Sequence, residues 1–432
     1  MSREMKDSGV EWIGEIPEDW EIIPNKHLMK KVKNLCPVYN GEDILSLSMK
    51  GVYVRDPNDE SGKRPTTYNG YQYVQEGDLL MCLFDIDVTP RCVGRVYNNG
   101  LTSPAYSRFV MNKTRAIVDY YYYYYLALDF DKTLLHLSKN MRSSLTESDF
   151  GSINAPVPSP TEQQQIVHFL DRKCTAIDTA IEKTKKSIEK LEEYKKAVIT
   201  KAVTNGIDPN AKMKDSGVEW IGEIPEDWEV QKLKHAVTKL SKGNGITKDD
   251  VVENGDISCV RYGEIYTQYN YVFDKCKTRT NIGKVSSPQT FSYGDILCAG
   301  TGELIDEIGK SVVYLGKELC LAGGDIIVIK HQQDPLFMSF LLNSAYCQGQ
   351  RSIGKYKLKV VHISAGDIGN IKIALPRLND QRKIAQFLKE KNELINGMIE
   401  AKINSIKKLE EYKKSLIYYA VTGKIDCRGE EL

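Results

Sequence analysis

The sequence predicts an α+β protein made of two copies of one unit, each a globular domain of short strands followed by a long helix. The stretch MKDSGVEWIGEIPEDWE occurs without a difference at Met5–Glu21 and again at Met213–Glu229. Farther along, LEEYKK stands at Leu191–Lys196 and at Leu409–Lys414. One of these motifs stands near the start of the repeated segment and the other near its end. Their joint repetition indicates that a whole structural unit has been duplicated.

Length and composition are those of an ordinary soluble protein. The 432 residues allow two to four domains, and 41% of them are hydrophobic and 27% charged. No apolar run approaches the roughly 20 residues that span a bilayer, and the first residues lack the apolar centre of a signal peptide. We therefore expect a cytoplasmic protein with no membrane partner. The net charge of +1 leaves nucleic acid open, because acidic segments can balance a basic groove.

The repeated 17-residue stretch contains every tryptophan of the chain: Trp12, Trp20, Trp220 and Trp228. Its first copy carries six acidic residues and one lysine, so it is a poor binder of phosphate. Pro17 and Pro225 interrupt any long helix there. We interpret each copy as a clasp, whose tryptophans and isoleucines anchor a domain to the rest of its unit.

The globular part of each unit is predicted to be a mixture of short strands and turns. Runs such as GDLLMCLF, SRFVM, SVVYL and DIIVIK are typical of strands, and Gly, Asn, Asp and Pro separate them. The segments VDYYYYYYLALDF and DPLFMSFLLNSAY resemble helices at equivalent places. Tyr120–Tyr125 could instead form a base-stacking platform, but such a platform needs its rings on a strand face or a loop. A half-buried helix is therefore favoured.

The interiors of the two units differ much more than their ends. The offset between the copies grows from 208 at the tryptophan motif to 217 at Gly77-Asp78 and Gly294-Asp295, and it then barely changes. Nearly all the extra length of the second copy thus lies between Glu229 and Gly294. Because the units share their ends but differ in their interiors, we predict that they perform two versions of one function on a common structural framework.

The second part of each unit is predicted to be a helix of about 33 residues, roughly 50 Å long. Mostly apolar residues recur there at alternating spacings of four and three, which is a heptad seam. The first series is Leu170, Cys174, Ile177, Ile181, Thr184, Ile188, Leu191, Lys195, Val198 and Ala202. The second is Leu388, Asn392, Ile395, Ile399, Lys402, Ile406, Leu409, Lys413, Leu416 and Ala420. The two helices should form a coiled coil, and the seam alone leaves their relative orientation open.

The sequence lacks the motifs of the enzymes that act on DNA. There is no phosphate-binding Gly-x4-Gly-Lys-Ser/Thr loop, and no methyltransferase pairing of a Gly-rich loop with Asn/Asp-Pro-Pro-aromatic. Asp85 and Asp87 have no third carboxylate or lysine nearby in a nuclease pattern. The ten cysteines form no Cys-x-x-Cys pair, so we expect reduced, mostly buried thiols and no metal site. We predict no catalytic residue and no enzymatic activity.

The order of the motifs resembles the specificity subunit of a type I restriction–modification enzyme. WIGEIPEDWE, GDLL or GDIL, EQQQIVHFL or DQRKIAQFL, LEEYKK, and AVTNGID or AVTGKID follow one another twice. SPAYSRF at Ser103–Phe109 is also similar to a segment of that family. The resemblance covers essentially the whole chain. It implies target recognition domains at 1–155 and 211–373, and helical spacers at 156–210 and 374–432.

The resemblance also implies how such a chain works. The two domains would read the halves of a bipartite, asymmetric site in double-stranded DNA, and the helices would form an antiparallel coiled coil with pseudo-twofold symmetry. Two methyltransferase (modification) subunits would dock on this frame, and restriction motor–nuclease subunits would join them. S-adenosylmethionine, ATP and Mg²⁺ would belong to those partners, with no cofactor in this chain.

Candidates for DNA contact come from side-chain chemistry alone, because target domains are expected to differ between members of the family. Arg and Lys suit phosphates and guanine, Asn suits adenine, and Tyr suits the backbone. The candidates are Lys50, Arg55, Lys63, Arg64, Tyr68, Arg91, Arg142, Lys242, Asn244, Lys248, Arg261, Tyr262, Lys355 and Lys357. Any one of them taken alone is better explained as a solvated surface residue. Their clustering where the copies diverge favours recognition.

Two other classes of protein fit parts of the pattern. A coiled-coil adaptor that binds proteins and not DNA would explain the helices, but it has little need for divergent interiors on matched frames. A self-contained nuclease or methyltransferase is disfavoured by the missing motifs.

Overall fold

The computed structural model describes residues 3–56, 65–137, 143–285, 287–304, 308–353 and 361–429. The chain divides into two compact units, Met1–Thr184 with Ile403–Leu432, and Lys185–Lys402. The two long helices are α4 (Pro160–Asn205) and α10 (Leu378–Val421). Each unit therefore contains a globular part together with one half of each long helix.

The first unit is built around a four-stranded sheet of order β4-β11-β8-β9. Its strands are β1 (Met5–Asp7), β2 (Glu15–Pro17), β3 (Glu21–Pro24), β4 (Met29–Lys31), β5 (Leu45–Ser48), β6 (Gly51–Val54), β7 (Gln72–Val74), β8 (Leu79–Met81), β9 (Val93–Arg95), β10 (Gly100–Thr102), β11 (Ser107–Met111) and β12 (Asn154–Val157). Its short helices are α1 (Val118–Phe130), α2 (Thr133–His136) and α3 (Glu147–Ser152). The pair β3·β12 joins the start of the domain to its end.

The second unit repeats this plan with more strands. They are β13 (Met213–Asp215), β14 (Glu223–Pro225), β15 (Glu229–Lys232), β16 (Val237–Lys242), β17 (Ile257–Val260), β18 (Val272–Phe273), β19 (Thr278–Thr280), β20 (Thr290–Phe291), β21 (Ile296–Ala299), β22 (Thr301–Gly302), β23 (Ser311–Tyr314), β24 (Cys320–Ala322), β25 (Ile326–His331), β26 (Val361–His362) and β27 (Lys372–Leu375). The short helices are α5 (Leu233–Ala236), α6 (Tyr262–Thr267), α7 (Pro335–Leu342), α8 (Ala345–Ser352) and α9 (Ala365–Gly369). The sheet order β16-β25-β21-β23 matches β4-β11-β8-β9, and β15·β27 matches β3·β12. The predicted duplication and the α+β class are confirmed.

The repeated Gly-Asp pair is a turn that leads into the central strand of each sheet. Gly77 and Gly294 both have φ of +86°, a conformation that side chains other than hydrogen rarely allow. The following aspartates close the turn: Asp78 accepts a hydrogen bond from the Gln75 amide at 2.6 Å, and Asp295 accepts one from the Ser292 amide at 2.8 Å. This motif is structural in both units.

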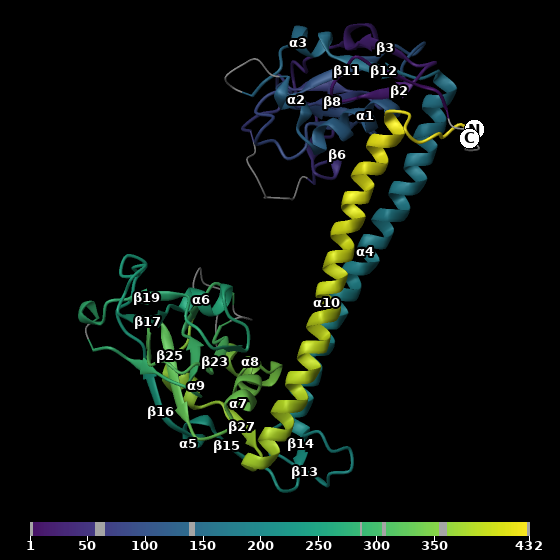
Figure 1. The fold of residues 1–432 in the computed structure, drawn as a ribbon. Coiled ribbons are helices and arrows are strands. Elements are labelled where there is room, and N and C mark those ends of the chain that lie inside the picture. Colours follow the sequence, from purple (N-terminus) through teal and green to yellow (C-terminus); the bar gives the residue numbers. More distant parts are fainter. Residues whose placement is uncertain are drawn as a thin grey trace. The chain divides into compact units, whose positions relative to one another are not determined.

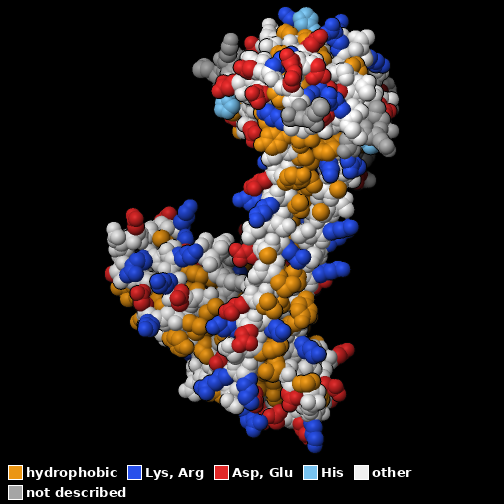
Figure 2. Space-filling model, turned by 45° about the vertical axis from the view of Figure 1, so that its right-hand side comes forward, with side chains coloured by type: hydrophobic (Ala, Val, Ile, Leu, Met, Phe, Trp, Pro, Cys, Tyr) orange, Lys and Arg blue, Asp and Glu red, His pale blue; other side chains and the backbone are white. Residues whose placement is uncertain are grey.

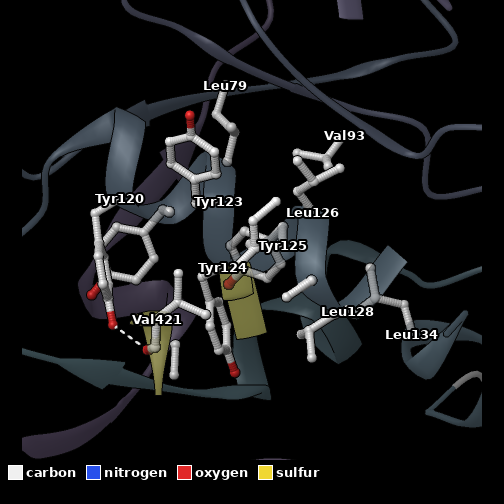
Figure 3. Close-up of a cluster of buried hydrophobic side chains, with 14 of the residues drawn as sticks. Leu79, Val93, Tyr120, Tyr123, Tyr124, Tyr125, Leu126, Leu128, Leu134 and Val421 are labelled. Atoms are coloured by element: carbon white, nitrogen blue, oxygen red, sulfur yellow. Dashed lines mark hydrogen bonds between the residues drawn. The ribbon is translucent and has the colours of Figure 1, made fainter. Parts of the chain in front are cut away.

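The tyrosine run forms the buried helix α1 and not a stacking platform. Tyr122 is partly buried and the other five tyrosines are buried in the core of the first unit (Figure 3). Their hydroxyls reach polar groups around the core: Tyr120 donates to the Val421 carbonyl at 2.8 Å, and Tyr123 to Asp171 at 2.6 Å. Tyrosine suits this helix because its ring fills the core while its hydroxyl finds a partner at the edge.

The long helices pair in antiparallel fashion in each unit, and α4 and α10 run side by side in Figure 1. In the first unit Lys413 donates to Asp178 at 2.6 Å, and in the second Lys195 donates to Asn396 at 2.8 Å. From Asp178 to Lys195 the position on α4 advances by 17 residues, while the contacted position on α10 goes back by 17, from Lys413 to Asn396. The two helices therefore run in opposite directions. The antiparallel coiled coil is thus confirmed.

Both helices are longer than the predicted 33 residues, at 46 for α4 and 44 for α10. The additional turns lie at their ends, where Gln163 and Gln381 are buried against the globular parts. Gln163 bonds the Arg115 carbonyl at 2.7 Å, and Gln381 bonds the Asp334 amide at 2.9 Å. The heptad seam misses these turns because there the helices pack on domains and not on each other.

The 17-residue repeat forms a β-hairpin in both units, β1·β2 and β13·β14, with the same register. In the first unit Trp20 is buried and donates to Glu162 at the start of α4 at 3.0 Å, and Tyr418 of α10 donates to the Trp12 carbonyl. In the second unit Trp228 is buried, and Asn205 at the end of α4 donates to the Glu223 carbonyl at 3.0 Å. Each hairpin thus lies where one long helix begins and the other ends.

Trp12 and Trp220 differ from the other two tryptophans. Trp12 is partly buried against the core of the first unit, whereas Trp220 is 52% exposed and has Lys372 over its ring at 5.9 Å. Trp220 therefore adds little buried apolar area to the second unit.

Two smaller features complete the fold. All ten cysteines are free, and nine of them are buried, as expected for reduced structural thiols. Among the described residues, no helix combines the length and the apolar character needed to cross a membrane.

Candidate nucleic-acid interface

The first unit has a groove of about 880 Å³ on its globular part. One wall is the β5·β6 hairpin with Lys50 at its turn, and the other is the segment that follows β8, which carries Arg91. Tyr106, directly before β11, also lines it. The structure thus brings together two of the predicted DNA-contacting residues that are 41 positions apart in the sequence.

The groove also contains aromatic side chains that the sequence pattern did not indicate. Tyr53 and Phe84 are exposed there, and the rings of Phe84 and Tyr106 stack with centroids 6.4 Å apart. Burial raises the pKa of Tyr106, so its phenol remains a hydrogen-bond donor. Exposed rings next to cations can stack on bases or sugars. The only sequence signal for Tyr106 was its place in SPAYSRF.

Three described candidates of the first unit, Arg91, Arg55 and Tyr68, have contacts within the fold. Arg91 is mostly buried, and its guanidinium is 3.8 Å from Asp129, which reduces its free charge. Arg55 is half-buried, and its amide bonds the Ile44 carbonyl at 2.8 Å. Tyr68 packs between two tyrosine rings, each with its centroid 5.1 Å away. Neither Arg55 nor Tyr68 lines the groove.

The second unit has a groove of about 830 Å³ that gathers more of the predicted residues. Lys248, Arg261 and Tyr262 all line it. Lys242 pairs with Asp325 of the same groove at 3.1 Å, and Asn244 precedes the lining residue Gly245. Lys248 is exposed and Tyr262 is 40% exposed, so both are accessible from solvent.

Arg261 and Lys277 illustrate what the sequence could and could not indicate about this groove. The Arg261 guanidinium is 2.9 Å from Glu264, three residues along α6, so an intrahelical carboxylate offsets part of its charge. Lys277 also lines the groove and donates to Gln268 at 3.2 Å. Neither Lys277 nor Gln268 was among the predicted contacts: Lys277 lies outside the polar runs that supplied the candidates, whereas Gln268 lies in the same run as Arg261 and Tyr262.

The two grooves have one lining position in common and otherwise differ. Tyr106 precedes β11 and Asp325 precedes β25, and these strands hold the same place in their sheets. The rest of the lining is the β5·β6 hairpin and the segment after β8 in one unit, and the loop 245–248 with α6 in the other. Each unit therefore presents a different surface from an equivalent position.

Five candidates fall outside the described residues: Lys63, Arg64, Arg142, Lys355 and Lys357. In the described part of the chain, no group of three or more His, Cys, Asp or Glu residues is arranged to hold a metal ion.

Comparison with known proteins identifies the family. Residues 17–193 and 225–408 each match the family described as the type I restriction modification DNA specificity domain. The chain belongs to this family. With two copies of the domain, it is a DNA-specificity subunit of a type I restriction–modification system.

Individual relatives agree with this family over their full lengths. The specificity subunit of type I restriction enzyme MjaVIII from Methanocaldococcus jannaschii is 28% identical over 430 residues, which are 96% of this chain and 95% of that protein. A solved structure of the HsdS subunit from Thermoanaerobacter tengcongensis covers 95% of this chain and 98% of its own, with a TM-score of 0.54 and 14% identity. A chain from a structure of type I R-M complex assembly and conformational transition has a TM-score of 0.71 at 13% identity, with coverage of 95% and 99%. These solved structures share the fold of this specificity subunit.

Proposed function

We propose that this specificity subunit reads a bipartite, asymmetric DNA site, one half with the groove of each unit. The observation that carries the proposal is that grooves at a corresponding place in the two units have unlike linings. Cationic and aromatic side chains along a groove suit the phosphates and bases of DNA, and different linings suit different base edges. Two unlike grooves on one chain would produce an asymmetric site.

The groove chemistry supports roles for particular residues. Lys50 and Lys248 would contact phosphates, because both are exposed lysines at a groove. Tyr53, Phe84 and Tyr262 would pack on sugars or bases. Arg261 could turn from Glu264 to a guanine, exchanging one charge-assisted contact for another.

A domain exchange tests this proposal. Replacing residues 22–155 by the corresponding domain of another family member should change one half of the methylated site and leave the other half and the spacing unaltered. The readout is the methylation pattern of genomic DNA in cells that also supply the modification subunits. An unaltered site would refute the assignment of one half-site to each unit.

We further propose that two methyltransferase subunits dock on the helices, one on each half of the pair. In the face drawn in Figure 2, hydrophobic side chains lie at the helix surface among charged ones. Tyr194 and Tyr412, the tyrosines of the two LEEYKK segments, are both 54% exposed. Equal exposure at equivalent positions suits two copies of one partner, since exposed apolar side chains are frequent at interfaces.

Restriction motor–nuclease subunits would join this assembly in the cytoplasm. The chain itself would catalyse no reaction, and the partners would supply S-adenosylmethionine, ATP and Mg²⁺.

Docking is tested by replacing each of the two tyrosines. Tyr194→Ala and Tyr412→Ala should each weaken the binding of one methyltransferase subunit by about tenfold, and the double variant should lose both. Stoichiometry is measured by analytical ultracentrifugation, and circular dichroism verifies folding. Leu394→Ala on α10, 60% exposed and outside LEEYKK, serves as the control. Complexes of wild-type stoichiometry and affinity from the double variant would refute docking at LEEYKK.

A further inference from the structure

The second unit contains a polar pocket that none of the roles above uses. It has a volume of about 580 Å³ and lies between α4 and the globular part of the same unit. Four cationic side chains line it: Lys195, Lys196, Lys310 and Arg351. Glu192 is the one carboxylate among its described lining residues. Helix α6 separates this pocket from the groove, since Tyr266 lines the pocket whereas Arg261–Glu264 line the groove.

Arg351 is the deepest of these cations and has no carboxylate partner among the described residues. Its side chain lies on α8, and the residue is only 4% exposed. One Nη donates to the Gly309 carbonyl, while Nε is buried without any hydrogen-bond partner. A buried guanidinium with an unused donor is unfavourable unless an anion reaches it. An anionic ligand in the pocket would supply the counter-charge that the described residues do not give Arg351.

Lys195 shows that the charge of this pocket is particular to the second unit. Its ammonium donates to the Asn396 amide oxygen at 2.8 Å. In the first unit the equivalent Lys413 donates to the Asp178 carboxylate at 2.6 Å and 2.7 Å. Asn396 holds the place of Asp178 in the repeat, so a neutral amide replaces the carboxylate that neutralises the other lysine. Glu192, 3.6 Å from Lys195, has the counterpart Glu410 in LEEYKK and does not account for the difference.

Backbone contacts hold Lys310 beside these groups. Its ammonium donates to the carbonyls of Tyr266 at 3.3 Å and Tyr269 at 3.1 Å. With Lys196 on the next residue of α4, four cations thus converge on a pocket whose volume suits a ligand up to the size of a nucleotide.

We propose that this pocket binds a phosphate group, carried by a small phosphorylated compound or by the DNA backbone. Arg and Lys together are the side chains that bind phosphate oxygens most effectively, through charge-assisted hydrogen bonds. The depth of Arg351 and Lys195 favours a small free ligand over the backbone of a stiff duplex. The site is independent of DNA reading by the grooves, and in the first unit the equivalent lysine, Lys413, is neutralised by Asp178.

The test is a calorimetric titration of the full-length chain with pyrophosphate at constant ionic strength. Asn396→Asp restores the carboxylate found in the other unit, and it should weaken binding by about tenfold or more. The matched variant Asp178→Asn, in the first unit, should bind as wild type does. Arg351→Met should abolish binding, and Asn396→Asp keeps the test decisive if that variant does not fold. Absence of binding by the wild type at about 1 mM, or equal binding by wild type and Asn396→Asp, would overturn the proposal.

A second titration distinguishes the two sources of phosphate. A non-specific DNA duplex, added with pyrophosphate, should leave the pyrophosphate affinity of the wild type unchanged if the ligand is a small compound. Displacement of pyrophosphate by the duplex in the wild type and in Asp178→Asn would instead identify the DNA backbone as the source. A domain exchange that fails to alter the DNA site would leave both titrations unaffected, so the two proposals fail separately.

Discussion

Replacing Asp78 by Asn should destabilise the first unit far more than Asp295→Asn destabilises the second, although both residues belong to the same Gly-Asp turn. Asp78 is 2.6 Å from the Arg108 guanidinium, and these side chains are only 5% and 7% exposed. Asp295, whose side chain is 10% exposed, is 3.3 Å from the Lys330 ammonium, whose side chain is 32% exposed, so solvent screens this pair from the lysine side. Asparagine keeps the volume and an oxygen that can accept the turn hydrogen bond, so each substitution removes chiefly the charge.

The expected magnitudes follow from burial. Removing one partner of a buried ion pair leaves an uncompensated charge and costs about 3–5 kcal/mol. An ion pair open to solvent contributes about 0–1 kcal/mol. In a unit of this size 1 kcal/mol corresponds to a shift of about 2–4 °C in Tm, so Asp78→Asn should lower the Tm of the first unit by roughly 6–20 °C. Asp295→Asn should lower that of the second by about 4 °C at most.

Calorimetry combined with hydrogen exchange would measure the two effects separately. A chain of two units need not unfold in one two-state transition, so exchange in β8 and β21 assigns each loss of stability to its unit. If the two variants lose the same stability within about 0.5 kcal/mol, the argument from burial is wrong.

Two further predictions concern other parts of the structure. Trp20→Phe should destabilise the first unit by about 1–3 kcal/mol in urea denaturation, because the buried Glu162 loses the indole N–H, whereas Trp220→Phe should change stability by less than about 0.5 kcal/mol. Equal losses from the two tryptophan variants would contradict the assignment of Trp20 as the buried anchor. Burial lowers the pKa of His331 below its ordinary 6.5, so the second unit should be fully stable above pH 6.5 and should lose stability as the pH falls, because the unfolded chain binds the proton more readily. His331→Gln should reduce this pH dependence. If the free energy of unfolding of the variant falls with decreasing pH as steeply as that of the wild type, His331 is not the cause of the dependence.

Much of the fold could be predicted from local sequence because spacing along the chain determines which faces of an element are apolar. The heptad series Leu170–Ala202 and its counterpart predicted the paired helices, since 3.6-residue periodicity is a property of near neighbours. Tyr120–Tyr125 were predicted to lie in a half-buried helix, and the structure buries that helix more fully. The exact repetition of the clasp and of LEEYKK predicted two equivalent units. Together with the order of the motifs, this was enough to indicate the family.

The candidate site was predicted only in part, because a side chain's surroundings come from residues distant in sequence. Lys50 and Arg91 meet in one groove through the packing of a hairpin against a loop, and only that packing shows Asp129 beside Arg91. Identical stretches leave Trp12 partly buried against a core and its counterpart Trp220 52% exposed. The antiparallel direction of the helices likewise rests on long-range pairing. The sequence by itself determined which residues recur, whereas the tertiary structure decided which charges are neutralised, as the contrast of Asp178 with Asn396 shows.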